Sequence, residues 1–215
     1  MINHDDSNDD ILKGYSMLLY FSGSFVLNQP QESCIHDLAS SNIFKKMPLA
    51  SSNPDFIMAS SYLNKIDEHA HIDYEEILDD HLRLFGGLGT PTAPPYESVY
   101  LSEDHLMFQK PSLEVKRIYE TYGWRSSLNG KVPEDHLGIE LQFLNLLLEK
   151  YHEIEDRICH KELAIDINKF IDNHLGTWIH SWNRDLQKNA ASDFYKGIGY
   201  LIVASVVDIK SIIRN

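Results

Sequence analysis

Cysteine, basic side chains and long apolar runs are all scarce in this sequence of 215 residues. Its two cysteines, Cys34 and Cys159, form no CxxC pair and no disulfide framework, so we expect reduced thiols. The longest strongly apolar run, residues 197–207, is much shorter than the ~20 residues of a membrane span. The opening MINHDDSNDD lacks the basic and apolar regions of a secretory signal. We therefore expect a cytoplasmic protein.

Acidic side chains outnumber basic ones by 32 to 19, which gives a net charge of -13. Residues 67–104 alone hold ten acidic side chains and one basic one, Arg83. Such a charge excludes most nucleic-acid and anionic-membrane binders, because these surfaces attract lysine and arginine. A partner drawn from a distance should be cationic. Solubility alone is the alternative interpretation of this charge.

Hydrophobic residues make up 43% of the chain, enough for a core, and their spacing is helical almost throughout. Asn53–Pro54 and Asp73 with Glu76 are typical helix starts, and Gly86 ends a helix. We predict helices over about 10–27, 54–66, 73–85, 112–122, a long one after residue 136 through 158, and then 162–173, 174–187 and 192–213. The sequence thus predicts one all-α domain, residues 1–215, built as a bundle of about nine or ten helices.

Signatures of catalysis and metal binding are weak. Carboxylate-bridged di-metal bundles use Glu-x-x-His pairs, which are present here as Glu68–His71 and Glu149–His152. The first predicted helix has no glutamate, however, and the second pair lies opposite the apolar stripe of its helix, facing water. His69 and His71 lack a third ligand. No nucleophile motif or phosphate-binding loop is present. We predict no catalytic and no metal residues, with a metal- or nucleotide-dependent enzyme or a generic cytosolic adaptor as alternatives.

Two polar segments are too unusual to be plain connectors. The first motif segment, residues 94–101, reads PPYESVYL: its prolines favour an extended backbone, and Tyr96 and Tyr100 flank a carboxylate. The second motif segment, residues 133–141, reads PEDHLGIEL and places carboxylates and a histidine at a helix start. These residue types suit a binding site.

Helix capping accounts for part of the second motif segment. Acidic residues are favoured in a first helical turn, which explains Glu134 and Asp135. Capping is not expected to explain His136, a cation-capable group at the positive end of a helix. Gly138 costs the helix ~1 kcal/mol relative to alanine and predicts the close approach of another backbone.

Together, the two motif segments resemble the TorD/DmsD family of redox-enzyme maturation chaperones. The resemblance extends to Leu84-Phe85-Gly86 before the first segment and to the spacing of about 30 residues between the two. It continues in His174-Leu175-Gly176-Thr177-Trp178 and in Phe194-Tyr195-Lys196. It covers about residues 74–207, and the PEDH and HLxxW forms look closer to the DmsD branch.

The resemblance implies a chaperone without catalytic activity that binds the twin-arginine signal peptide of a molybdopterin oxidoreductase. The client would be of the dimethyl sulfoxide or trimethylamine N-oxide reductase type, held as apoenzyme for cofactor insertion before export. The family implies no cofactor, with weak guanine nucleotide binding possible, and a monomer or a domain-swapped dimer. It also implies two lobes, about 1–105 and 112–215, joined by a hinge, with motif loops 86–100 and 123–136 between them.

Carried over residue by residue, the family's peptide site falls on seven positions here: Tyr96, Glu97, Tyr100, Pro133, Asp135, His136 and Trp178. DmsD-type members tend to carry Trp where this chain has Tyr96 and Tyr100, which puts client preference in doubt.

The chemistry of the residues agrees with a leader that carries two guanidinium groups and an apolar segment. Paired carboxylates bind a guanidinium bidentately, and the candidates are Glu97, Glu103, Asp104, Glu134 and Asp135. Phe85 with Tyr96 and Tyr100 could line an apolar groove; interlobe packing is the alternative for the tyrosines. We predict that His136→Leu or Asp135→Ala weakens leader binding more than stability.

Overall fold

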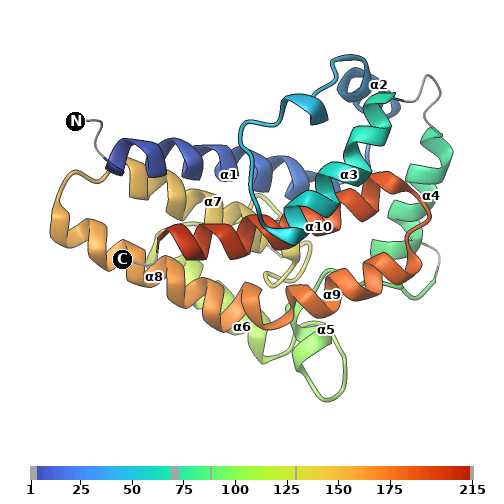
Figure 1. Ribbon diagram of the computed structural model, residues 1–215. Coiled ribbons are helices and arrows are strands. Elements are labelled where there is room, and N and C mark those ends of the chain that lie inside the picture. Colours follow the sequence, from blue (N-terminus) through green and yellow to red (C-terminus); the bar gives the residue numbers. More distant parts are fainter. Residues whose placement is uncertain (1–3, 69–72, 88, 129, 214–215) are drawn as a thin grey trace.

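The computed structural model describes residues 4–68, 73–87, 89–128 and 130–213 (Figure 1). The helices of this part are α1 (His4–Leu27), α2 (Glu32–Ser40), the 3₁₀-helix η1 (Phe44–Lys46), α3 (Pro54–Glu68), α4 (Tyr74–Phe85), α5 (Glu97–Leu101), α6 (Lys110–Thr121), α7 (Leu137–Glu153), α8 (Arg157–Phe170), the π-helix η2 (Ile171–Leu175), α9 (Gly176–Asn189) and α10 (Asp193–Ile212). The described residues form no strand, only an isolated antiparallel bridge between Tyr96 and His136. The predicted all-α class is confirmed.

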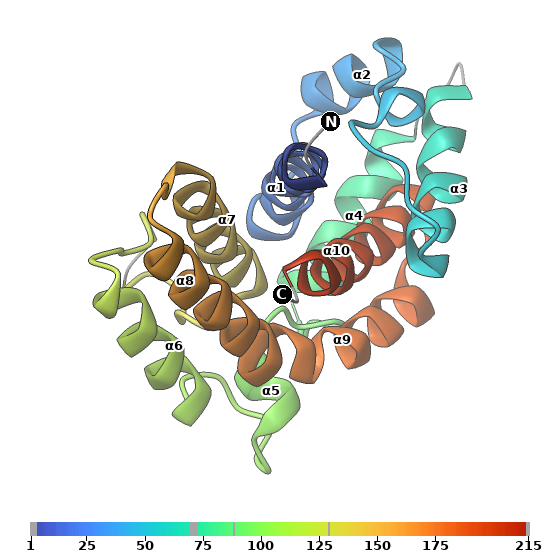
Figure 2. The same ribbon diagram turned by 60° about the vertical axis from the view of Figure 1, so that its left-hand side comes forward.

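Helix α10 lies at the centre of the bundle, packed against α3, α1 and α9 (Figure 2). Twelve of its residues are buried, so the apolar run 197–207 serves the core. Gly197 lets α3 approach closely, because a Cβ on it would lie 2.5 Å from Cγ of Leu63. No helix among the described residues has the length and apolar character needed to span a membrane.

Helices α1 and α7 form a second close pair (Figure 1). A Cβ on Gly138 would lie 2.8 Å from Cβ of Leu27 and 3.0 Å from the carbonyl oxygen of Gly23. The prediction that another backbone approaches this glycine is confirmed, and that backbone belongs to α1. The second motif segment is therefore fixed against the N-terminal helix.

Helices from both halves of the sequence share one core. α1 packs against α7 and α10, and α3 packs against α10. Elements of the two expected lobes, 1–105 and 112–215, are thus interleaved, and the two-lobe division with a hinge stays a prediction.

Local capping sets the starts of α3 and α4 where the sequence placed them. The Asp73 side chain accepts the N–H of Glu76 at 3.0 Å, and Oδ1 of Asn53 accepts the N–H of Asp55 at 2.9 Å. Both starts were predicted.

The predicted long helix through residue 158 is wrong at its end. α7 stops at Glu153, Ile154 is extended, and α8 starts after Asp156, whose Oδ1 accepts the N–H groups of Ile158 and Cys159 at 2.9 Å. The chain turns here because Asp156 caps a new helix instead of continuing the old one. The short helices α2 and α5 were also not predicted; α5 begins at Glu97, after the two prolines of the first motif segment, for which an extended backbone was predicted.

Candidate functional site: the junction of the two motif segments

The two motif segments lie against each other through their backbones. The N–H of Glu97 donates to the carbonyl of Asp135 at 3.1 Å, and the N–H of Leu137 donates to the carbonyl of Pro95 at 2.8 Å. The rings of Tyr96 and His136 meet edge to face at 5.1 Å between centroids. The segments 94–101 and 133–141, far apart in the sequence, therefore form one local unit, which we call the motif junction.

Asp135 links the junction to α5. Its Oδ2 accepts the N–H of Ser98 at 2.8 Å, and both residues are fully buried. Ser98 is in the first turn of α5, so the carboxylate supplies from another segment the cap that Tyr96 at the N-cap position does not provide. This long-range cap explains how a five-residue helix can start directly after a segment with two prolines.

His136 is the N-cap of α7. Its Nδ1 accepts the N–H of Gly138 at 3.0 Å, so the ring proton resides on Nε2. Burial, with a smaller contribution from the nearby His81, lowers the pKa of His136 to about 3, which keeps the imidazole neutral. The expectation that capping would not explain His136 is wrong: a neutral imidazole can accept a hydrogen bond that an imidazolium cannot. The place of His136 in a peptide site stays a prediction.

Three carboxyl groups at the junction are almost completely buried. Glu97, Asp135 and Glu140 are each exposed by 1% or less. Both Glu97 oxygens face Nδ1 of His174, at 3.1 and 3.2 Å, so this imidazole bonds the Glu97 carboxylate within the cluster. We call Glu97, Asp135, Glu140 and His174 the junction acid cluster.

The surroundings of Glu140 disfavour the charged form of its carboxyl. Burial raises the pKa of its carboxyl well above the usual 4.5, and the charges of Glu97 and Asp135 raise it further. The indole of Trp178 lies near enough to favour the ionised form, but no bond of ordinary geometry joins it to either Glu140 oxygen. Burial and the neighbouring carboxylates therefore favour the protonated form of Glu140.

Glu140 and His174 belong to the cluster although neither was among the predicted site residues. Glu140 precedes Leu144 by four residues and so lies on the apolar stripe of α7. A charged residue on a buried stripe was a signal in the sequence for a functional or ion-paired group. His174 was part of the quoted HLGTW resemblance, but only the fold brings it to Glu97.

The predicted aromatic residues divide between two places. Tyr100 is partly exposed and stacks on the buried Trp178 at 5.5 Å, beside the junction. Burial raises the pKa of the Tyr100 hydroxyl, and Asp185 raises it further. Phe85 instead packs in the core, stacked on Trp182 at 6.3 Å. The structure brings Tyr96, Tyr100 and Trp178 to the junction, and it buries Phe85 in an aromatic cluster.

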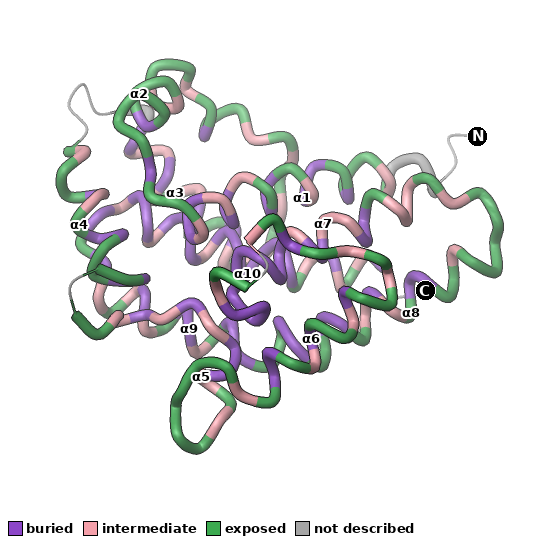
Figure 3. The backbone as a smooth tube through the Cα atoms, turned by 180° about the vertical axis from the view of Figure 1, so that it is seen from behind, coloured by how far each residue is buried: buried purple, intermediate pink, exposed green. Residues whose placement is uncertain are grey.

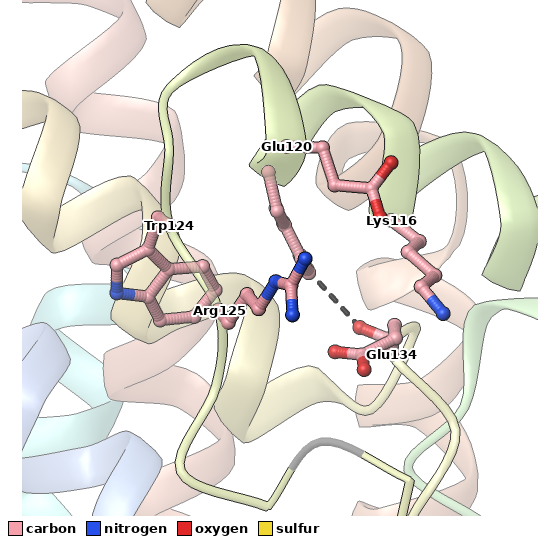
Figure 4. Close-up of a pocket in the computed structure, with 6 residues that line it drawn as sticks. Lys116, Glu120, Trp124, Arg125 and Glu134 are labelled. Carbon is pink, nitrogen blue, oxygen red and sulfur yellow. Dashed lines mark hydrogen bonds between the residues drawn. The ribbon is translucent and has the colours of Figure 1, made fainter.

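A small pocket lies beside Glu134 (Figure 4). Its volume is about 90 Å³, and its lining is Lys116, Tyr119, Glu120, Trp124, Arg125 and Glu134. The Tyr119 hydroxyl donates to the backbone carbonyl of Glu134 at 3.1 Å. Burial raises the pKa of the Glu134 carboxyl, while the charge of Lys116 lowers it. Small-molecule sites measure about 300–1,000 Å³, so this pocket is too small for a nucleotide.

Only some of the carboxylates in the acidic run 67–104 lie on the surface. Asp80 is fully buried and accepts hydrogen bonds from the N–H groups of Ala191 and Ser192 at 2.7–3.0 Å, besides an ion pair with Arg83. Glu97 is buried in the junction acid cluster. Glu103 and Asp104 are exposed in the loop after α5. Part of the charge thus holds the fold together, and part faces solvent beside the junction.

The Glu-x-x-His pairs are now placed where the structure describes them. Glu149 is exposed as predicted, but His152 does not face water: its Nδ1 bonds the carboxylate of Asp9, because α1 packs along this side of α7. His69 and His71 fall at positions 69–72, outside the described residues, so the Glu68–His71 pair is not tested. Within the described ranges, no group of three or more His, Cys, Asp or Glu could hold a metal ion.

Comparisons with known proteins agree with the sequence resemblance. The family model described as nitrate reductase delta subunit matches residues 57–184. The chain is 30% identical over 129 residues to the chaperone protein TorD of Vibrio parahaemolyticus, a match covering 60% of each chain. It is 28% identical over 145 residues to TorD of Vibrio cholerae, covering 67% of this chain and 64% of the relative. The first of these matches spans about 60% of the relative's length.

This chain belongs to the nitrate reductase delta subunit family, the family of the TorD and DmsD chaperones. Its relatives are named chaperones, and the family is non-enzymatic. The matched region includes both motif segments and ends just after Trp182. Both Vibrio relatives are TorD proteins, and the closer likeness to the DmsD branch stays a prediction.

Proposed function

We propose that this protein is a cytoplasmic maturation chaperone that binds the twin-arginine signal peptide of a molybdopterin oxidoreductase. The client is of the dimethyl sulfoxide or trimethylamine N-oxide reductase type, held as apoenzyme until its cofactor is inserted. The chaperone acts without a catalytic group or cofactor of its own, with at most weak guanine nucleotide binding, as a monomer or domain-swapped dimer. Its family membership supports the general role.

The junction acid cluster is the observation that carries the proposal for the peptide. Three carboxyl groups are buried close together, the imidazole of His174 bonds only Glu97, and burial with the neighbouring carboxylates raises the pKa of Glu140. A guanidinium is always charged and bonds two carboxylates in a fixed plane. It would neutralise this cluster better than the proton that Glu140 now holds.

Access requires the two motif segments to separate. Two backbone hydrogen bonds, Glu97 to Asp135 and Leu137 to Pro95, and the Ser98–Asp135 cap hold them together. A leader would select the opened arrangement by replacing these contacts with its own, and its affinity is reduced by the fraction of molecules that are closed.

Titration calorimetry with a synthetic leader tests the proposal. A peptide with an Arg-Arg pair followed by an apolar segment should bind, and its affinity should fall with salt. The matched peptide with Ala-Ala should bind at least tenfold more weakly, since each lost charged hydrogen bond is worth about 1.5–3 kcal/mol. Equal binding of both peptides would refute the role of the carboxylates.

A single substitution tests whether the junction acid cluster binds the arginine pair. Glu97→Gln keeps the shape of the side chain and removes its charge, so it should weaken binding of the Arg-Arg leader. The control Glu149→Gln removes one carboxylate from the exposed face of α7 and should bind like the wild type. An unchanged affinity in Glu97→Gln would place the arginines elsewhere on the protein.

A further inference from the structure

The loop between α5 and α6 exposes a group of large apolar side chains. The exposed fractions are 57% for Leu106, 45% for Met107 and 68% for Phe108, and flanking Leu101 and Leu113 are 45% and 57% exposed. Single exposed apolar residues are ordinary, but consecutive ones on a small soluble protein mark an interaction site. Figure 3 shows this loop projecting from the body of the molecule beside α5, coloured mostly as exposed. We call Leu106, Met107 and Phe108 the apolar loop tip.

The backbone holds the tip in an unfavourable conformation. His105 has φ 51° and Phe108 has φ 60°, the left-handed region that non-glycine residues rarely adopt. The ring Nδ1 of His105 bonds the carbonyl of Val99 at 2.7 Å. The backbone N–H of His105 donates to the carbonyl of Ser102 at 3.1 Å. Strain retained to display apolar groups to water is typical of a functional segment.

The charges around the apolar loop tip indicate the chemistry of its partner. Glu103 and Asp104 are exposed immediately before it. Lys110 after it is paired with Glu114 at 3.0 Å on α6. An apolar surface with two adjacent carboxylates complements a peptide that joins cationic residues to an apolar run.

The tip is also continuous with the motif junction. α5 carries Glu97 of the junction acid cluster at its start and Leu101 at its end, and the loop follows directly. Tyr100, which lies between Glu97 and Leu101 in α5, stacks on Trp178. A single extended peptide can therefore reach both.

We propose that the apolar loop tip docks the apolar segment that follows the arginine pair of the client's signal peptide. This inference rests on the proposed function, which it deepens by placing the second half of the leader. The occupant is the leader, because charge complementarity and continuity with the junction both favour a peptide with cations beside its apolar residues. A second copy of this chain, or the mature body of the client, are the other outcomes of the test.

The experiment is titration of the Arg-Arg leader into the full chain and into the triple variant Leu106→Ser/Met107→Ser/Phe108→Ser. The tip is exposed, so the variant should keep its melting temperature. Its affinity for the leader should fall about tenfold or more, the loss expected when exposed apolar anchors no longer contact a partner. The matched control is Ile158→Ser/Ile165→Ser, which removes side chains 70% and 53% exposed on α8, and it should bind like the wild type.

The outcomes separate this inference from the proposed function. If the wild type binds the leader and the triple variant binds it equally well, the tip does not dock the leader and the inference is overturned, while the proposed function stands. If the wild type binds no leader, both are overturned. If the triple substitution abolishes a dimer seen by analytical ultracentrifugation without changing leader affinity, the tip joins two copies and the inference is wrong. If it abolishes binding of the leaderless apoenzyme but not of the leader, the tip serves the client's body and the inference again fails.

Discussion

Relative to the wild type, the variant Glu140→Gln should become progressively more stable as pH rises. Glu140 is fully buried, and burial together with the charges of Glu97 and Asp135 raises the pKa of its carboxyl well above 4.5. Between pH 4.5 and its folded-state pKa, the folded protein binds one proton more than the unfolded chain at this group. The free energy of unfolding therefore falls with pH in this window, by about 1.4 kcal/mol per pH unit.

Glutamine has the shape of the protonated acid and does not titrate. The difference in unfolding free energy, Glu140→Gln minus wild type, should thus rise by about 1.4 kcal/mol per pH unit above pH 5 and level off at the folded-state pKa. Urea unfolding of both proteins at half-unit steps from pH 5 to pH 8.5 measures this difference. Titrating groups that do not interact with Glu140 cancel in the subtraction.

Glu149→Gln is the control, because it removes a carboxylate from the exposed face of the same helix. Its difference from the wild type should not depend on pH. A difference for Glu140→Gln that is also constant with pH would refute the reasoning, since it would mean that Glu140 is ionised in the folded protein and that the cluster is not in conflict.

Two further substitutions test how the fold positions the site. Asp80→Asn should lower the free energy of unfolding in urea by about 2–4 kcal/mol, because a fully buried carboxylate that accepts bonds from Ala191 and Ser192 becomes an amide. The control Asp79→Asn, at an exposed neighbour, should change the free energy of unfolding little. An equal effect of the two substitutions would contradict the account. Gly138→Ala should lower the free energy of unfolding by about 1–3 kcal/mol, because the added methyl would lie 2.8 Å from Cβ of Leu27. Helix propensity alone predicts the opposite, a raised melting temperature. That result would show that α1 and α7 are not in close contact.

Features coded by neighbouring residues were predictable from the sequence. The helical class follows from periodicity, and the starts of α3 and α4 follow from Asn53 and Asp73, which cap their own helices. The break after α7 was also coded locally, by Asp156, but the apolar spacing across it favoured one continuous helix. Gly138 was interpreted correctly because its cost to the helix requires a compensating contact.

Features that depend on distant segments were not predictable in the same way. Helix α5 forms because Asp135, from the second motif segment, caps it. The meeting of His174 with Glu97 depends on the path of the chain through α8 and η2. The burial of Phe85, and the contact of His152 with Asp9, likewise follow from packing between helices. The sequence identified the motif segments, and the fold decided which of their side chains are buried.

Proton release on leader binding tests the central claim most directly, that a guanidinium takes its place in the junction acid cluster. The leader should displace the proton of Glu140, because a bound cation lowers the pKa of that carboxyl. Calorimetry of the Arg-Arg leader at pH 7 in two buffers with different ionisation enthalpies counts the protons. We predict release of close to one proton and tighter binding as pH rises, with neither effect in Glu140→Gln; binding that releases no proton in the wild type would contradict the claim.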